Sequence, residues 1–214
     1  VAMGSCALDS NTTGCQNIVF GRETMATNTI GAGNVAIGHN TMYANTEGQF
    51  NVAIGKQTLD ANTTGDFNTA VGYKALSANT TVDGNTAVGT CALLCNITGD
   101  LHTAVGLCAF SGITTARKNT GVGSKVGFNT TTGSSNVAIG QDAFKNNTTG
   151  SCNVAIGAAT LDANTTASEN IGIGYNALAV NTTGCVNIGI GNNVMQENTT
   201  GCHNTVVGIS GLQC

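Results

Sequence analysis

A 17-residue motif repeats along the whole chain without any shift in register. When the sequence is divided before each repeated Asn, it gives rows such as NVAIGKQTLDANTTGDF (51–67) and NTAVGYKALSANTTVDG (68–84). Eleven complete rows fill residues 17–203, with an incomplete row on either side. Repetition at a fixed period is typical of a solenoid in which each repeat forms one rung. We therefore expect a single domain, residues 1–214, of about 12.5 rungs.

Row positions, numbered 1 to 17 from the repeated Asn, separate strand residues from corner residues. Position 5 is Gly in all thirteen rows, which predicts a positive φ or a lack of room for a Cβ. Position 4 is Ile or Val in all but the first two rows, and position 9 is mostly Leu, Met or Phe. We expect both positions to face inward. Because position 3 is small, each N-V-A-I-G segment is predicted to be a short strand with one bulky and one small face.

The rest of the row predicts a second short strand around A-L, followed by an Asn-Thr-Thr-Gly corner. Position 12 is Asn in ten of twelve rows, and stacked Asn side chains can form amide ladders. No 3.6-residue periodicity is visible. The predicted fold is all-β, a single-chain β-solenoid (β-helix or β-roll) of parallel 17-residue rungs. At about 4.8 Å per rung, such a rod would be roughly 60 Å long.

Composition argues against several classes of protein. Charged residues make up 8% of the chain and the net charge is −4, which does not favour nucleic-acid binding. No apolar run approaches the roughly 20 residues that span a bilayer, so we expect no membrane insertion. The chain begins with Val inside a row without a signal peptide, which indicates a processed product or a segment of a longer array. His39, His102 and His203 lie on distant rungs, so we expect neither an enzyme nor a cofactor.

Nine cysteines are many for a reducing compartment and predict an extracellular location. Two pairs share a row position on consecutive rows, position 7 in one pair and position 16 in the other, so rung spacing would allow disulfides. Cys95 and Cys152 are interpreted as small buried residues. The disulfide candidates are Cys91 with Cys108, Cys185 with Cys202, and also Cys6, Cys15 and Cys214.

Metal binding is a weaker alternative at two places, and no metal site is predicted. A zinc set would consist of Cys91, Cys95, His102 and Cys108. Their spacing matches no strong zinc pattern. Position 16 of four consecutive rows carries Asp66, Asp83, Asp100 and Arg117. A solvated carboxylate ladder that ends at the Arg is favoured over a Ca²⁺ site, because the glycine-rich calcium repeat is absent.

Two other departures from a uniform repeat leave alternatives open. Phe50 and Phe67 share position 17 and are expected to stack, either as a local apolar patch or as a contact with another chain. Rows 102–118 and 119–135 are the least regular. They contain Ile113 and Thr130 at position 12, Gly127 at position 9, and the cations Arg117, Lys118 and Lys125. Drift of the repeat is favoured there over a binding patch.

The Asn-Thr-Thr corner also matches the N-glycosylation sequon, although the same residues are good turn formers. The candidate sites are Asn11, Asn62, Asn79, Asn96, Asn129, Asn146, Asn147, Asn164, Asn181 and Asn198. Regularly spaced threonines on a β-solenoid are also similar to those of ice-binding proteins. Here the two threonines are adjacent, so only one hydroxyl per rung is expected to face outward.

The N-V-A-I-G and N-T-A-V-G segments resemble the head repeats of trimeric autotransporter adhesins. The segment N-T-A-V-G-Y-K-A-L-S-A-N-T-T (68–81) is similar to repeats in phage and viral tail-fibre proteins. The resemblance covers the whole chain and implies a β-roll in an elongated surface fibre, either a single rod or a trimer. The adhesin repeat is shorter than this one, and neither family is usually so rich in cysteine.

We therefore expect a structural subunit of an extracellular fibre that polymerises head to tail with copies of itself through open solenoid edges. A disulfide from Cys214 to Cys6 or Cys15 of the next copy would lock that joint. Glycans at the corners would be the other partners. The alternative function is a trimeric adhesin or tail-fibre binding module, and an ice-binding rod is a further one.

Overall fold

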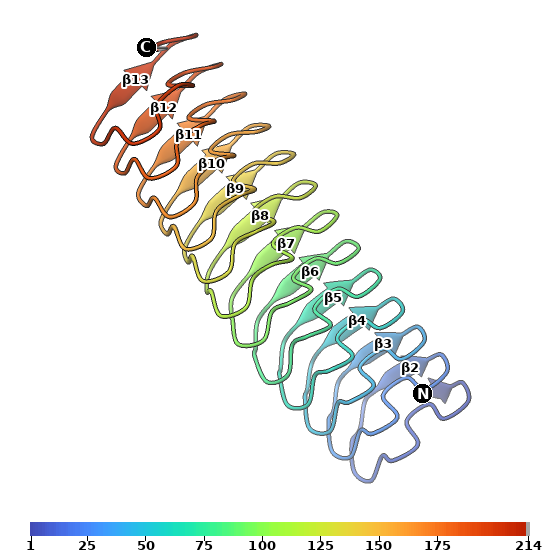
Figure 1. The fold of residues 1–214 in the computed structure, drawn as a ribbon. Helices are drawn as coiled ribbons and strands as arrows, with labels where there is room; N and C mark the ends of the chain where they lie inside the picture. The colour runs from blue at the N-terminus through green and yellow to red at the C-terminus, as the bar shows by residue number, and fades with distance from the viewer. Residues whose placement is uncertain (213–214) are drawn as a thin grey trace.

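The computed structural model describes residues 1–212, and within that range it contains strands and turns but no helix. Thirteen strands form one parallel sheet in chain order along an extended rod (Figure 1). They are β1 Ala2–Met3, β2 Ile18–Phe20, β3 Val35–Ile37, β4 Val52–Ile54, β5 Thr69–Val71, β6 Thr86–Val88, β7 Thr103–Val105, β8 Thr120–Val122, β9 Val137–Ile139, β10 Val154–Ile156, β11 Ile171–Ile173, β12 Ile188–Ile190 and β13 Thr205–Val207. The predicted all-β solenoid is confirmed.

Every strand pairs with the next at an offset of one full row. In β4 and β5, for example, Val52 is opposite Thr69 and Ile54 is opposite Val71. The register is the same from β1 to β13, so residues at one row position form a column along the rod. A single rung therefore corresponds to 17 residues, as the sequence predicts.

The prediction that position 4 faces inward is wrong. Ala53 at position 3 is fully buried, whereas Ile54 at position 4 is 38% exposed. Position 9 does face inward, as the buried Leu59 shows. The two inward positions pack directly on each other, since a Cβ added at Gly189 would lie 3.3 Å from Cδ1 of Leu178. The narrow interior accepts one large side chain per rung, so the strand turns its small residue inward and its bulky residues outward.

The second strand predicted around A-L does not form. Gln57 at position 7 and Leu59 at position 9 have left-handed backbones, with φ of 54° and 52°, and every rung repeats this alternation. It turns the segment too sharply for a strand. A left-handed conformation costs a non-glycine residue about 1–2 kcal/mol. The cost is offset by bonds between rungs, because Gln57 N–H donates to His39 O at 3.0 Å and Leu59 N–H donates to Ala75 O at 3.0 Å.

The backbone geometry at position 5, which repeats in every rung, explains why all thirteen rows have glycine there. Gly55 has a φ of 135°, a conformation that L side chains rarely adopt. A Cβ there would lie 2.7 Å from the carbonyl oxygen of Gly72 in the next rung. Both reasons that the sequence suggested therefore apply, and this corner admits no side chain.

Candidate functional site

Two columns of asparagine form the polar lining of the rod. At position 1, Asn51 donates its backbone N–H to Oδ1 of Asn34 at 2.9 Å and its Nδ2 to Gly65 O at 2.8 Å. At position 12, Asn62 donates Nδ2 to Oδ1 of Asn45 at 2.9 Å and to Gly65 O at 3.0 Å. The predicted amide ladder is thus confirmed, and it satisfies the buried corner carbonyls.

Most of the sequons lie in this buried ladder. Six of their asparagines are completely buried: Asn62, Asn79, Asn96, Asn147, Asn164 and Asn181. Asn11 and Asn198 are half-buried and use Nδ2, the atom that would carry a glycan, to bond Gly14 O and Asn181 Oδ1 respectively. Glycosylation at these eight positions is incompatible with the folded rungs. Asn129 and Asn146 lie at position 11, on the outside, where their amides bond each other at 3.0 Å.

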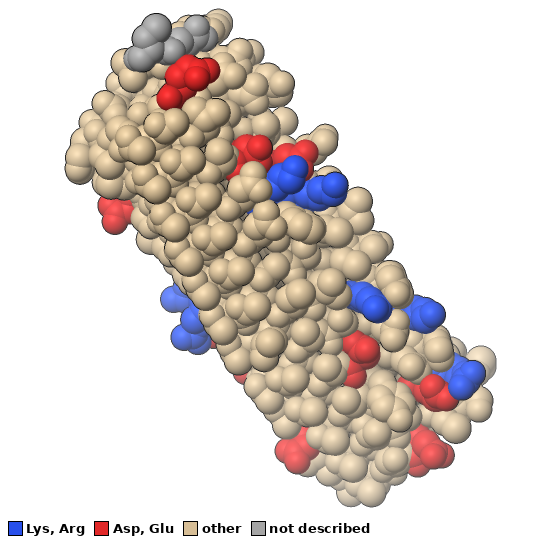
Figure 2. Space-filling model, viewed as in Figure 1, with Lys and Arg blue, Asp and Glu red and all other residues tan. Residues whose placement is uncertain are grey.

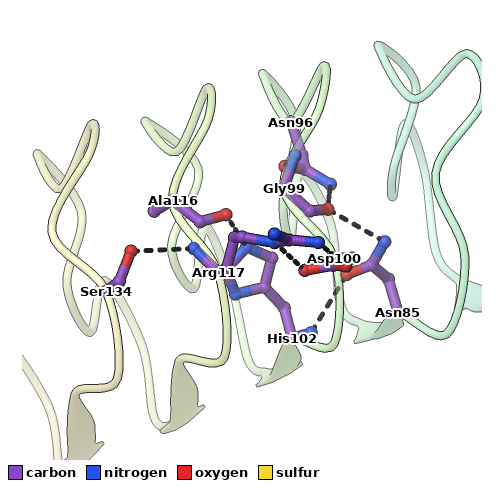
Figure 3. A network of polar contacts seen from close by, with 8 residues as sticks. All are labelled: Asn85, Asn96, Gly99, Asp100, His102, Ala116, Arg117 and Ser134. Carbon is purple, nitrogen blue, oxygen red and sulfur yellow. Dashed lines mark hydrogen bonds and ion pairs between the residues drawn. The ribbon is translucent and has the colours of Figure 1, made fainter.

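His102 takes the place of Asn in the position 1 column (Figure 3). Its Nε2 donates to Ala116 O at 2.8 Å, and its Nδ1 accepts the N–H of Asn119 at 3.1 Å. These contacts require the neutral ring with the proton on Nε2. Burial lowers the pKa of His102, in agreement with that assignment. Both ring nitrogens are occupied, so His102 is a structural residue.

The position 16 column carries the predicted carboxylate ladder, and it ends at Arg117 as expected. Asp66 donates its backbone N–H to Oδ1 of Asp83 at 2.7 Å. Arg117 Nε donates to Oδ1 of Asp100 at 2.6 Å, and its Nη2 bonds the other carboxylate oxygen. The side-chain bond from Arg117 lowers the pKa of Asp100. Among residues 1–212 no three His, Cys, Asp or Glu side chains are placed to hold a metal ion.

The cysteines occupy the surface more than the sequence suggests. Cys95 and Cys152 are exposed, so the prediction that they are buried is wrong. Both lie at outward row positions next to the corner asparagines. Cys185 and Cys202 lie with their Sγ atoms 3.0 Å apart. All eight described cysteines are thiols: Cys6, Cys15, Cys91, Cys95, Cys108, Cys152, Cys185 and Cys202. Cys214 lies outside the described residues.

The two threonines of each corner have different environments. Thr63 at position 13 is half-buried, and its Oγ1 donates to Thr80 O of the next rung at 3.0 Å. Thr64 at position 14 is exposed. Position 14 carries an exposed Thr on ten of twelve rungs, with Ile30 and Glu47 on the other two, so the expected single outward row of threonines is present but interrupted.

The irregular features have local packing explanations. Phe50 and Phe67 stack as expected, with ring centroids 5.4 Å apart, and are 52% and 62% exposed. Gly127 lacks the usual large side chain, but the ring of Phe110 in the preceding rung fills that space. A Cβ on Gly127 would lie 2.0 Å from Cε1 of Phe110. The change at position 9 is therefore a compensated substitution.

The outer face of the sheet is the most extensive feature without a partner in the described chain. We define it as the side chains at positions 2 and 4 of the thirteen rungs. Position 2 contains Val1, Ile18, Val35, Val52, Thr69, Thr86, Thr103, Thr120, Val137, Val154, Ile171, Ile188 and Thr205. Position 4 contains Met3, Phe20, Ile37, Ile54, Val71, Val88, Val105, Val122, Ile139, Ile156, Ile173, Ile190 and Val207.

This outer face carries no charge on any rung and remains partly exposed along the rod. Ile54 and Ile139 are 38% and 39% exposed although both have neighbouring rungs on each side. Figure 2 shows how few charged side chains lie on the visible surface of the rod. Position 4 is apolar on every rung, whereas position 2 is Thr on five rungs and aliphatic on the others. A long uncharged and mostly apolar face of this kind usually marks an interaction surface.

The chain matches no family model, no curated protein and no solved structure. Among the described residues there is no helix with the length and apolarity that a membrane span requires.

Sequence reasoning missed the outer face because bulky strand residues were assigned to the interior. The alternation itself was the available signal. A strand whose middle residue is always Ala, Gly or Val, between larger neighbours, can pack its small side against a single large residue from the opposite wall.

Proposed function

We propose that this chain forms a rod-like structural segment of an extracellular fibre, in which copies associate side by side through the outer face. The observation that carries the proposal is the uncharged, partly exposed double row of side chains at positions 2 and 4. Covering these side chains would remove apolar surface from water, at about 25 cal/mol per Å².

A second copy of the chain is the partner that this surface favours. The outer face repeats at the rung spacing, and only a partner with the same spacing can match it over many rungs. Another copy meets that requirement automatically. Phe50 and Phe67 each lie two residues before a strand and add exposed apolar surface at one edge of the face.

The extracellular part of the proposal is supported by the number and placement of the thiols. A high cysteine content is typical of proteins in oxidising compartments, and Cys185 and Cys202 are placed to form a disulfide there. The alternative, a trimeric adhesin or tail-fibre module, would use the same outer face and form one discrete species.

The test introduces charges on the outer face and leaves the interior residues unchanged. The double variant Ile54→Lys/Ile139→Lys places charges on β4 and β9, and Thr64→Lys/Thr149→Lys places the same charges on exposed corner positions of the same rungs. Sedimentation velocity should show self-association of the wild-type chain and the corner variant, and a monomer for the outer-face variant. Circular dichroism should show the same β-signal for all three.

Electron microscopy of the wild-type chain separates the two assemblies. Filaments or bundles support the fibre, and uniform trimers support the binding module. A wild-type chain that stays monomeric at every concentration, or an outer-face variant that associates as strongly as the wild type, would refute lateral association.

A further inference from the structure

Cys185 and Cys202 occupy position 16 of consecutive rungs, in a column that directs each side chain toward the preceding rung. Upstream in this column, Ser151 accepts the N–H of Ser134 on its Oγ, and Ser168 accepts the N–H of Ser151, both at 3.0 Å. Cys202 repeats the arrangement, because its Sγ accepts the N–H of Cys185 at 3.0 Å. Since both members are cysteines, their Sγ atoms also lie 3.0 Å apart.

The two thiols differ in accessibility and in charge preference. Cys202 is exposed, whereas Cys185 is half-buried. The thiol–thiol contact with Cys185 and the backbone N–H that Cys185 donates to Cys202 Sγ lower the pKa of Cys202. The same thiol–thiol bond raises the pKa of Cys185. Cys202 is thus the sulfur that more readily becomes a thiolate and that an external reagent can reach.

We propose that Cys185 and Cys202 form a thiol–disulfide exchange site for a small disulfide of the glutathione class, with Cys202 as the attacking sulfur and Cys185 as the resolving sulfur. The Cys202 thiolate attacks one sulfur of the disulfide, breaks its S–S bond and releases the first glutathione as a thiolate. Cys185 then loses its proton and attacks Cys202 Sγ, which releases the second glutathione. The two cysteines are oxidised and the glutathione disulfide is reduced to two thiols.

The product is a disulfide between adjacent rungs. The Sγ atoms have to approach from 3.0 Å to about 2.05 Å, and the constant rung spacing keeps the two Cα atoms within disulfide range. The bond would prevent the rung that carries β11 from separating from the rung that carries β12. This site stands independently of the proposed fibre, since it depends on contacts within one chain.

Serine variants provide the test, because serine occupies this column in three upstream rungs and keeps the acceptor for the preceding N–H. The full chain is treated with oxidised glutathione and its remaining thiols are alkylated. The chain is then digested, and the masses of its peptides are measured by mass spectrometry. The wild-type pair should become lighter by two hydrogen atoms. Cys185→Ser should retain one glutathione on Cys202, and Cys202→Ser should react at Cys185 about tenfold more slowly.

Cys95 and Cys152 serve as internal controls, because both are exposed thiols and the adjacent rungs have no cysteine at the same row position. Each should keep its glutathione in all variants. The exchange site is refuted if wild-type Cys202 also keeps its glutathione, or if Cys185 and Cys202 are both fully alkylated after oxidation. Equal rates in the two serine variants would refute the assigned order of attack.

Discussion

His102 replaces Asn in a column where eleven other rows use the amide side chain. The imidazole can replace the amide because its two nitrogens provide one hydrogen-bond donor and one acceptor in the same places. Asp100 and Arg117 are the charged groups beside it, and they pair with each other (Figure 3). A protonated ring would lose the bond from Asn119 and would place a charge in a buried site.

This substitution should make stability depend on pH. Burial lowers the pKa of His102 in the folded chain below its unfolded value of about 6.5. As pH falls below that value, the unfolded state binds a proton that the folded state does not, so the free energy of unfolding decreases. We expect the urea midpoint of the wild type to fall between pH 7 and 5 more than that of His102→Asn. Equal pH profiles would contradict this role of the neutral ring.

Phe110 and Gly127 form a size-complementary pair across adjacent rungs. Gly127→Leu should destabilise the chain by about 3 kcal/mol, because its side chain would overlap the ring of Phe110. Phe110→Leu should cost about 1–2 kcal/mol by leaving a cavity. The double variant restores the common pair of medium-sized residues and should recover at least half of the combined loss. Urea denaturation of the four chains measures this coupling, and additive effects would contradict it.

At the scale of the elements, the position 12 ladder is interrupted where its sequence changes. Asn96 turns its amide toward Gly99 alone, and Asn79 Oδ1 is left without a partner. The next two rungs have Ile113 and Thr130. The continuous ladders therefore run from Asn11 to Asn79 and from Asn147 to Asn198.

Removal of an amide donor from the ladder should reduce the stability of the chain. In Asn62→Asp, a carboxylate would face Asn45 Oδ1 and Gly65 O without a hydrogen to donate, in a fully buried position. We expect a loss of about 3 kcal/mol or more in the free energy of unfolding. Asn129→Asp, on the outside of the rod, should cost less than about 1 kcal/mol. Chemical denaturation compares the two, and similar losses would argue against the ladder as a source of stability.

The row period predicted the rungs, the glycine corner and the amide columns because each depends on one residue type at one position. The period alone does not show which strand face is inside, and the small residue at position 3 is the sequence signal that points to it. The period also could not reveal the left-handed residues, because positions such as Gln57 and Lys74 carry no residue typical of that conformation. The proximity of Cys185 to Cys202 was predictable from the register, but the order of their reactivity was not.

At the scale of the whole molecule, each rung contacts only its neighbours, as expected for a linear array of stacked units. Removal of residues 51–67 deletes one complete row and joins Phe50 to Asn68 with the register intact. We expect this chain to fold and to melt within about 5 °C of the wild type. Deletion of residues 51–58 alone leaves nine residues, too few for a rung, between two stacks whose own columns are intact, so its melting temperature in circular dichroism should fall much further than that of the full-row deletion. Similar melting of both deletions would contradict the requirement for register.

The hydrogen bonds between parallel rungs run along the rod, so tension applied to its two ends would load them lengthwise. The rungs would then detach one after another instead of sliding together. Each event would release a 17-residue loop, or roughly 55 Å of extended chain. Under an optical trap the molecule would lengthen in equal steps, and an oxidised Cys185–Cys202 bond would remove one of them. The repeat that sets the fold would thus also set a mechanical unit of extension.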